Sequence, residues 1–177
     1  MTRLILSCAA ALSLGSSAAT AGDIYARYFA GADRGKPCYA RSYDAAHLLA
    51  HPKQKVRRIE VDFDKNVGEG VGAKNSAAKF EAGFGFALKS SRAWYGDALY
   101  CQTLADHFDC YLDADGGTIR LTPQGDALQL EVTGGGGGGD QIAVEGRRDF
   151  GQFGAPGSDD RVFVLSRADH RMCRNGS

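Results

Sequence analysis

Two histidines in the first third of the chain have the spacing of a metal-binding pair. His47 and His51 lie four residues apart, which places two imidazoles on one face of a helix, as in many zinc sites. The glutamate that a metalloprotease carries next to the first histidine is missing, and Pro52 disfavours helical backbone at His51. A third ligand would have to come from elsewhere, such as His107 or His170. We expect ordinary surface histidines at a helix end, with a zinc site as the alternative.

A run of acidic residues in the middle of the chain resembles the start of a calcium loop. Asp113 and Asp115 precede two glycines, but the twelfth position of such a loop is Gln124, where an EF-hand needs a bidentate glutamate. A hairpin turn is therefore the expected structure. A loose cation site that also includes Asp109 and Asp126, at one end of the sheet, is the alternative.

Aromatic residues near arginine are the stronger candidates for a binding site. Trp94 and Tyr95 follow Arg92 in a predicted turn, and Tyr100 and Tyr111 fall on the polar face of a predicted hairpin. Aromatic residues and arginine are enriched where proteins recognise partners. The alternative is that a second layer of structure buries these side chains as core.

Motifs for nucleophilic catalysis are missing from the sequence. There is no Gly-x-Ser-x-Gly, and Ser166, Asp169 and His170 match a catalytic triad only in composition. The acids Glu60, Asp62 and Asp64 alternate with apolar residues along one predicted strand face, which typically indicates a solvated face. The sequence favours a protein without catalysis and indicates no cofactor.

Four of the five cysteines are predicted to form two disulfides. Cys8 lies in a segment that we expect to be removed, and an even number of cysteines in an exported chain indicates disulfides. An antiparallel hairpin with Cys101 opposite Cys110 places both among apolar neighbours on one face. Of the three possible connectivities we favour this pair, which leaves Cys38 with Cys173.

Alternation of apolar and polar residues predicts a mostly β domain. Asp44 is a suitable N-cap for one short helix, Ala45–Ala50, and Pro52 ends it. Strands are predicted at 38–41, 59–63, 80–88, 99–103, 108–112, 118–121, 128–132, 142–145 and 161–165, with a short strand or turn at 25–29. Loops are expected at 67–78 and 134–139. The expected fold is an antiparallel β-sandwich or small barrel with one short N-terminal helix, braced by two disulfides.

The first residues have the pattern of a secretory signal peptide. Met1-Thr2-Arg3 is a short basic start, residues 4–14 are apolar, and Ala19-Thr20-Ala21 matches a signal-peptidase site. We expect residues 1–21 to be a signal peptide and residues 22–177 to be a single exported domain in the periplasm or outside the cell. The apolar run is too short for a membrane anchor, and a lipoprotein modified at Cys8 is the alternative.

Three stretches resemble small uncharacterised exported proteins of Gram-negative bacteria. They are Cys-Tyr-Ala-Arg-Ser-Tyr-Asp-Ala-Ala-His-Leu-Leu-Ala-His-Pro-Lys-Gln-Lys-Val from Cys38, Phe-Asp-Cys-Tyr-Leu-Asp-Ala-Asp-Gly-Gly from Phe108, and Asp-Asp-Arg-Val-Phe-Val-Leu followed by Cys173. This resemblance implies no activity and no functional residues. In size, export and cystine-braced strands the chain is also similar to periplasmic lysozyme inhibitors, a likeness at the level of the fold alone.

Charge and composition narrow the possible functions. With 21 basic and 21 acidic residues, the chain has no overall field to attract nucleic acid or anionic lipid. We expect a non-catalytic, inhibitor-like binding module that recognises an envelope component or an extracellular protein. A periplasmic metal-dependent hydrolase or cation-binding protein is the first alternative, and an envelope structural protein is the second.

Overall fold

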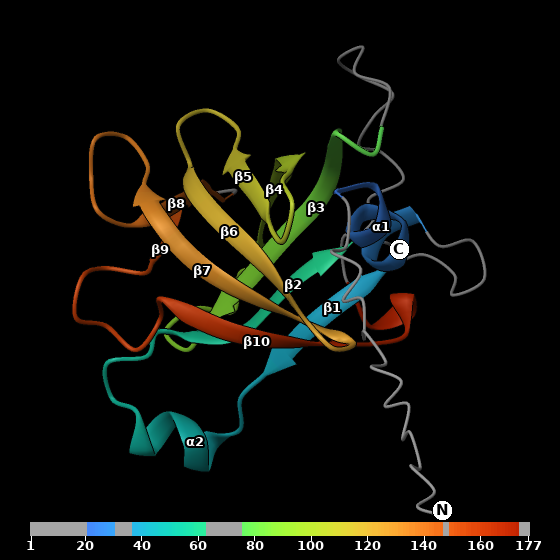
Figure 1. The fold of residues 1–177 in the computed structure, drawn as a ribbon. Helices are drawn as coiled ribbons and strands as arrows, with labels where there is room; N and C mark the ends of the chain where they lie inside the picture. Colours follow the sequence, from blue (N-terminus) through green and yellow to red (C-terminus); the bar gives the residue numbers. More distant parts are fainter. Residues whose placement is uncertain (1–20, 31–36, 63–75, 147–148, 174–177) are drawn as a thin grey trace, which may run out of the picture.

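Eight antiparallel strands close into a barrel in this computed structural model (Figure 1). The structure describes residues 21–30, 37–62, 76–146 and 149–173. Around the barrel the strands follow the order β1-β10-β7-β6-β5-β4-β3-β2, and β8 and β9 form a separate two-stranded sheet. Neighbours in the barrel are mostly neighbours in sequence, and only the β8–β9 hairpin interrupts this order. The predicted signal peptide lies outside the described residues except for Ala21.

The helices and strands have the following bounds. The barrel strands are β1 (Cys38–Ser42), β2 (Val56–Asp62), β3 (Lys79–Leu88), β4 (Tyr95–Thr103), β5 (Phe108–Leu112), β6 (Gly117–Gln124), β7 (Ala127–Gly135) and β10 (Val162–Arg167). The hairpin consists of β8 (Ile142–Glu145) and β9 (Phe150–Phe153). The helical segments are α1 (Ala21–Tyr25), the π-helical turn η1 (Ala26–Ala30), α2 (Ala45–Ala50) and the 3-10 turn η3 (His170–Met172).

The predicted fold class is confirmed, and of its two forms the barrel is the one that occurs. The predicted helix is α2, where the Asp44 carboxylate accepts a hydrogen bond from the His47 backbone N–H at 2.8 Å. Two predictions were wrong. Residues 25–29 are helical because their aromatic side chains pack onto the barrel end. Residues 150–153 form β9, although they lie in a stretch that was expected to be a loop because it contains glycine, proline and serine.

The helical segment α1–η1 covers one end of the barrel (Figure 1). The ring of Phe29 lies 4.5 Å from that of Phe80 and 5.1 Å from that of Phe108, between ring centroids. The Tyr28 hydroxyl donates a hydrogen bond to the Gly125 carbonyl at 2.5 Å. These contacts attach the N-terminal segment to the starts of β3 and β5 and to the β6–β7 turn.

The β8–β9 hairpin covers the opposite end (Figure 1). Phe153 is fully buried, and its ring centroid lies 4.8 Å from that of Phe86 and 5.8 Å from that of Phe163. The apolar side chains that point into the barrel form one continuous buried cluster with both covers. Burial of this cluster is the main stabilising contribution to the fold.

Both predicted disulfides are present. Cys101 and Cys110 are directly opposed on β4 and β5, with their Cα atoms 4.1 Å apart. Cys38 and Cys173 join β1 to the C-terminal segment across a sequence separation of 135 residues. Among the described residues, no helix is both long and apolar enough to cross a membrane.

Candidate binding groove on the barrel wall

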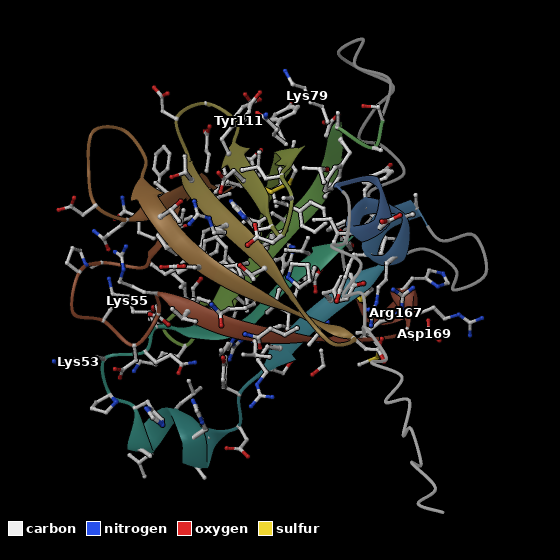
Figure 2. All side chains as sticks on the ribbon, viewed as in Figure 1. Lys53, Lys55, Lys79, Tyr111, Arg167 and Asp169 are labelled. Carbon is white, nitrogen blue, oxygen red and sulfur yellow. A yellow bond between two sulfur atoms is a disulfide. The ribbon has the colours of Figure 1, made fainter. Side chains whose placement is uncertain are left out.

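The outer surface of strands β3 to β7 carries a groove of about 490 Å³, which we call the wall groove. Its volume falls within the range of roughly 300–1,000 Å³ typical of ligand-binding clefts. The residues that line it are Lys79, Phe80, Glu81, Tyr100, Cys101, Gln102, Asp109, Cys110, Tyr111, Thr118, Ile119, Arg120 and Thr133. Figure 2 labels Lys79 and Tyr111 near each other on this part of the barrel. The Cys101–Cys110 disulfide therefore lies directly beneath the groove.

Strand register arranges the polar side chains of the wall groove in two adjacent rows. In one row, successive partners across the strands are Lys79, Gln102, Asp109 and Arg120. In the other row, they are Glu81, Tyr100, Tyr111 and Thr118. Because side chains alternate between the two faces of a strand, both rows point outward while the residues between them point into the core. The barrel thus places a charged row beside an aromatic row.

Two stacked tyrosines form the centre of the aromatic row. The rings of Tyr100 and Tyr111 lie 5.2 Å apart between centroids, with 25° between their planes. Tyr111 is 57% exposed, so much of its ring is available to a partner. Burial, with smaller contributions from Glu81 and other acidic neighbours, raises the pKa of Tyr100. Like other tyrosine hydroxyls, that of Tyr100 is protonated at neutral pH and can donate a hydrogen bond.

An ion pair holds the charged row in place. The Arg120 guanidinium donates a hydrogen bond to the Asp109 carboxylate at 2.9 Å, and this bond is the main cause of the lowered pKa of Asp109. On the other side, His107 Nε2 lies 3.4 Å from the same carboxylate. Beyond the aromatic row, the Thr133 hydroxyl donates to the Thr118 hydroxyl at 3.1 Å. These contacts orient the side chains before any ligand is present.

The structure places some residues of the predicted aromatic patch on the outer face and buries another in the core. Tyr100 and Tyr111 lie together on the outer face, as the hairpin register predicts. Tyr95 is 1% exposed, so its proposed role in a surface patch was wrong. Its ring stacks on Phe86 because the β8–β9 hairpin folds over this barrel end. Trp94 is half-buried and Arg92 is exposed, and neither lines the wall groove.

The histidine pair of α2 stacks instead of converging on a common point. The ring centroids of His47 and His51 are 4.3 Å apart with 25° between the planes, and the Tyr43 ring stacks on the other side of His47. His47 Nε2 also forms a hydrogen bond with the Gln54 side chain at 3.0 Å. Parallel rings do not aim their nitrogens at one ion. Within the described part of the chain, neither histidine belongs to a group of three possible metal ligands.

The acidic run forms the predicted turn. Asp113 accepts a backbone hydrogen bond from Gly116 at 2.9 Å, and Asp115 has a positive φ of 60°. The backbone therefore reverses between β5 and β6, as in a hairpin. In the described ranges, neither aspartate belongs to a cluster with three metal-ligand side chains. Asp109 pairs with Arg120 in the wall groove, and Asp126 lies 3.4 Å from Arg27.

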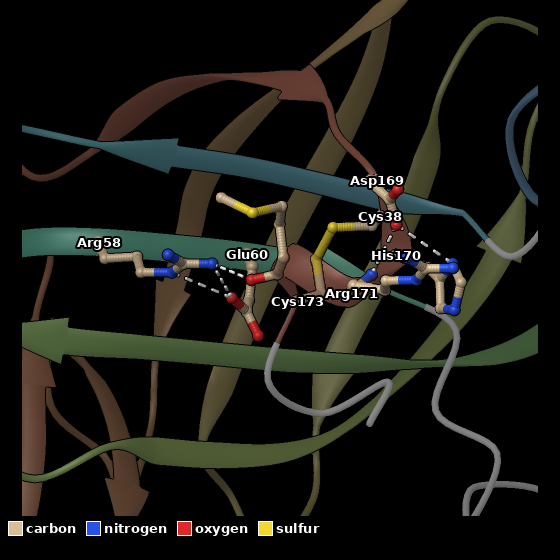
Figure 3. The surroundings of a disulfide bond; sticks show 8 residues. Cys38, Arg58, Glu60, Asp169, His170, Arg171 and Cys173 are labelled. Atoms are coloured by element: carbon tan, nitrogen blue, oxygen red, sulfur yellow. Dashed lines mark hydrogen bonds and ion pairs between the residues drawn. A yellow bond between two sulfur atoms is a disulfide. The ribbon is translucent and has the colours of Figure 1, made fainter.

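A second acidic cluster lies under the C-terminal segment, where a solvated face was expected. Glu60 and Asp62 are 0% and 1% exposed, and their carboxylates approach the Cys173 sulfur. Figure 3 shows the Cys38–Cys173 disulfide beside Glu60, with Arg58 bonded to both Glu60 and the Met172 carbonyl. The disulfide draws the C-terminal segment across this face and buries it. Since the Cys173 sulfur is bonded to Cys38, it is not a thiolate ligand here.

Sequence reasoning did not identify the charged row of the wall groove as part of a site. Lys79, Asp109 and Arg120 come from three strands and share no sequence motif. The register of the β4–β5 hairpin could have identified them. When that register is extended to β3 on one side and to β6 on the other, Lys79, Asp109 and Arg120 fall in one row.

Comparisons of the chain with protein-family models, curated proteins and solved structures found no match.

Proposed function

We propose that this chain is an exported, non-catalytic binding module that recognises an envelope component or an extracellular protein through the wall groove. The observation that carries the proposal is a groove with a stacked tyrosine pair beside an oriented ion pair. A closed barrel is a suitable scaffold because every barrel strand is paired on both sides. Preorganised side chains reduce the entropy lost on binding.

Export is part of the same proposal. Its support is the signal-like start of the sequence together with two disulfides, which persist mainly in oxidising compartments. An inhibitor-like role fits a surface whose tyrosine stack and ion pair are already in place.

The test compares the immobilised, oxidised wild-type protein with two single variants. Tyr111→Ala removes the exposed half of the tyrosine stack, while Phe150→Ala removes a 63% exposed aromatic side chain that does not line the wall groove. Native envelope and extracellular fractions are passed over each. We expect the wild type and Phe150→Ala to retain the same component and Tyr111→Ala to lose it. Retention of the same component by all three would reject the groove, and retention of nothing would reject the binding function.

A further inference from the structure

The charges that line the wall groove are balanced. Lys79 and Arg120 provide two cations, and Glu81 and Asp109 provide two anions. For a ligand of either sign, attraction to the two groups of opposite charge is offset by repulsion from the two groups of like charge. A ligand without net charge that offers both donors and acceptors is therefore the class that this balanced set of charges favours.

The neutral groups of the wall groove are also matched to a polar ligand. The Gln102 amide can donate and accept. Because the Thr133 hydroxyl donates to Thr118, Thr118 can donate to a ligand and Thr133 can accept from one. The charged pair adds strong hydrogen-bonding groups, since Arg120 has several N–H donors and Asp109 accepts only one from it at 2.9 Å. Donors and acceptors therefore alternate along the groove.

The tyrosine pair supplies an apolar surface beside these polar groups. Tyr111 is 57% exposed and is held by its stack on Tyr100. An aromatic ring with a polar tip suits a ligand that has one apolar face and a polar edge. Sugar rings have this form, because their C–H bonds gather on one face and their hydroxyls project around the rim.

We propose that the wall groove binds an uncharged oligosaccharide, with a sugar ring packed on Tyr111 and its hydroxyls bonded by Asp109, Arg120 and Gln102. This inference rests on the proposed binding function and names its ligand class. A groove of about 490 Å³ gives room for a short segment of such a chain. A folded protein partner would also have to contact surface around the groove, because standard protein interfaces bury about 800 Å² on each partner.

The experiment is a titration of the isotope-labelled, oxidised protein, followed by amide chemical shifts. The neutral probes are cellotriose, maltotriose and triacetylchitotriose, and trigalacturonate is the charged comparison. We expect at least one neutral probe to shift resonances of β3 to β6 and to bind more tightly than trigalacturonate. Tyr111→Ala should weaken that binding about tenfold, and Phe150→Ala should change it by less than about twofold.

Two further variants show which contacts in the groove bind the oligosaccharide. Tyr111→Phe keeps the ring and should retain most of the affinity, whereas Arg120→Gln should weaken binding without unfolding the protein, because its side chain is on the surface. The oligosaccharide proposal is overturned if no neutral probe binds at millimolar concentration, or if trigalacturonate binds as tightly. If a protein from the native fractions is then retained in a Tyr111-dependent way, the binding function stands and only the ligand class fails.

Discussion

The Arg120 guanidinium on β6 donates to the Asp109 carboxylate on β5 at 2.9 Å, directly across the strands in register. Because this bond stabilises the ionised carboxylate, the pKa of Asp109 is lowered. Folding thus lowers its pKa below the ordinary value of about 3.9. The resulting contribution to stability is present above that pH and is lost as the pH falls through the folded-state pKa.

The first prediction is that Arg120→Gln raises the pKa of Asp109 toward its ordinary value. An NMR titration of the Asp109 carboxyl carbon measures the midpoint directly. Arg92→Gln removes an exposed guanidinium that makes no contact with Asp109 and should leave the midpoint where it is. An equal midpoint in wild type and Arg120→Gln would show that the ion pair does not control this carboxylate.

The second prediction concerns the contact between the β8–β9 hairpin and the barrel. A Cβ atom at Gly151 would lie 2.4 Å from Tyr95 Cγ, at the rigid base of a fully packed ring. Gly151→Ala should therefore lower the free energy of unfolding by about 1–3 kcal/mol, measured by urea denaturation. Gly139→Ala is the matched control, since its Cβ would make only an ordinary contact, 3.4 Å from a carbonyl oxygen. Equal stability of the two variants would contradict the packing.

The third prediction concerns a buried carboxylate that anchors the start of β2. Asp160 is 0% exposed and accepts hydrogen bonds from the backbone N–H groups of Lys55 at 2.6 Å and Val56 at 3.1 Å. Asp160→Ala should destabilise the protein by about 1–3 kcal/mol for each buried donor that is left without a partner. Asp159→Ala, at the exposed neighbouring position, should have little effect in the same urea experiment. A small loss for Asp160→Ala would mean that water replaces the carboxylate.

The fourth prediction compares the two disulfides. Cys38–Cys173 spans 135 residues and Cys101–Cys110 spans 9. If a disulfide acts mainly by restricting the unfolded chain, the long link contributes about 5 kcal/mol and the short link about 3 kcal/mol. Replacing Cys38 and Cys173 together by alanine should accordingly destabilise the protein more than replacing Cys101 and Cys110. Urea unfolding of both double variants decides the order, and the reverse order would show that local strain or packing outweighs chain entropy.

Patterns that depend on neighbouring residues were sufficient to predict much of the structure. Alternation marks the long strands because one face of each is buried, and Asp44 marks the start of α2 because its carboxylate caps the first turn. The Cys101–Cys110 pair follows from the register of one hairpin. The outward direction of Tyr100 and Tyr111 follows from the same register, which is why their position side by side on one face could be predicted.

The remaining features of the structure depend on contacts between segments that are far apart in the sequence. A sandwich and a barrel have the same alternation of apolar and polar residues. The pairing of β1 with β10, through Tyr39 with Arg167 and Ala40 with Ser166, closes the sheet into a barrel. Tyr95 is buried because the β8–β9 hairpin folds over its ring, and Glu60 is buried because the Cys38–Cys173 link draws the C-terminal segment across it. The alternation of a strand shows which residues share a face, but whether that face meets solvent depends on which remote segment packs against it.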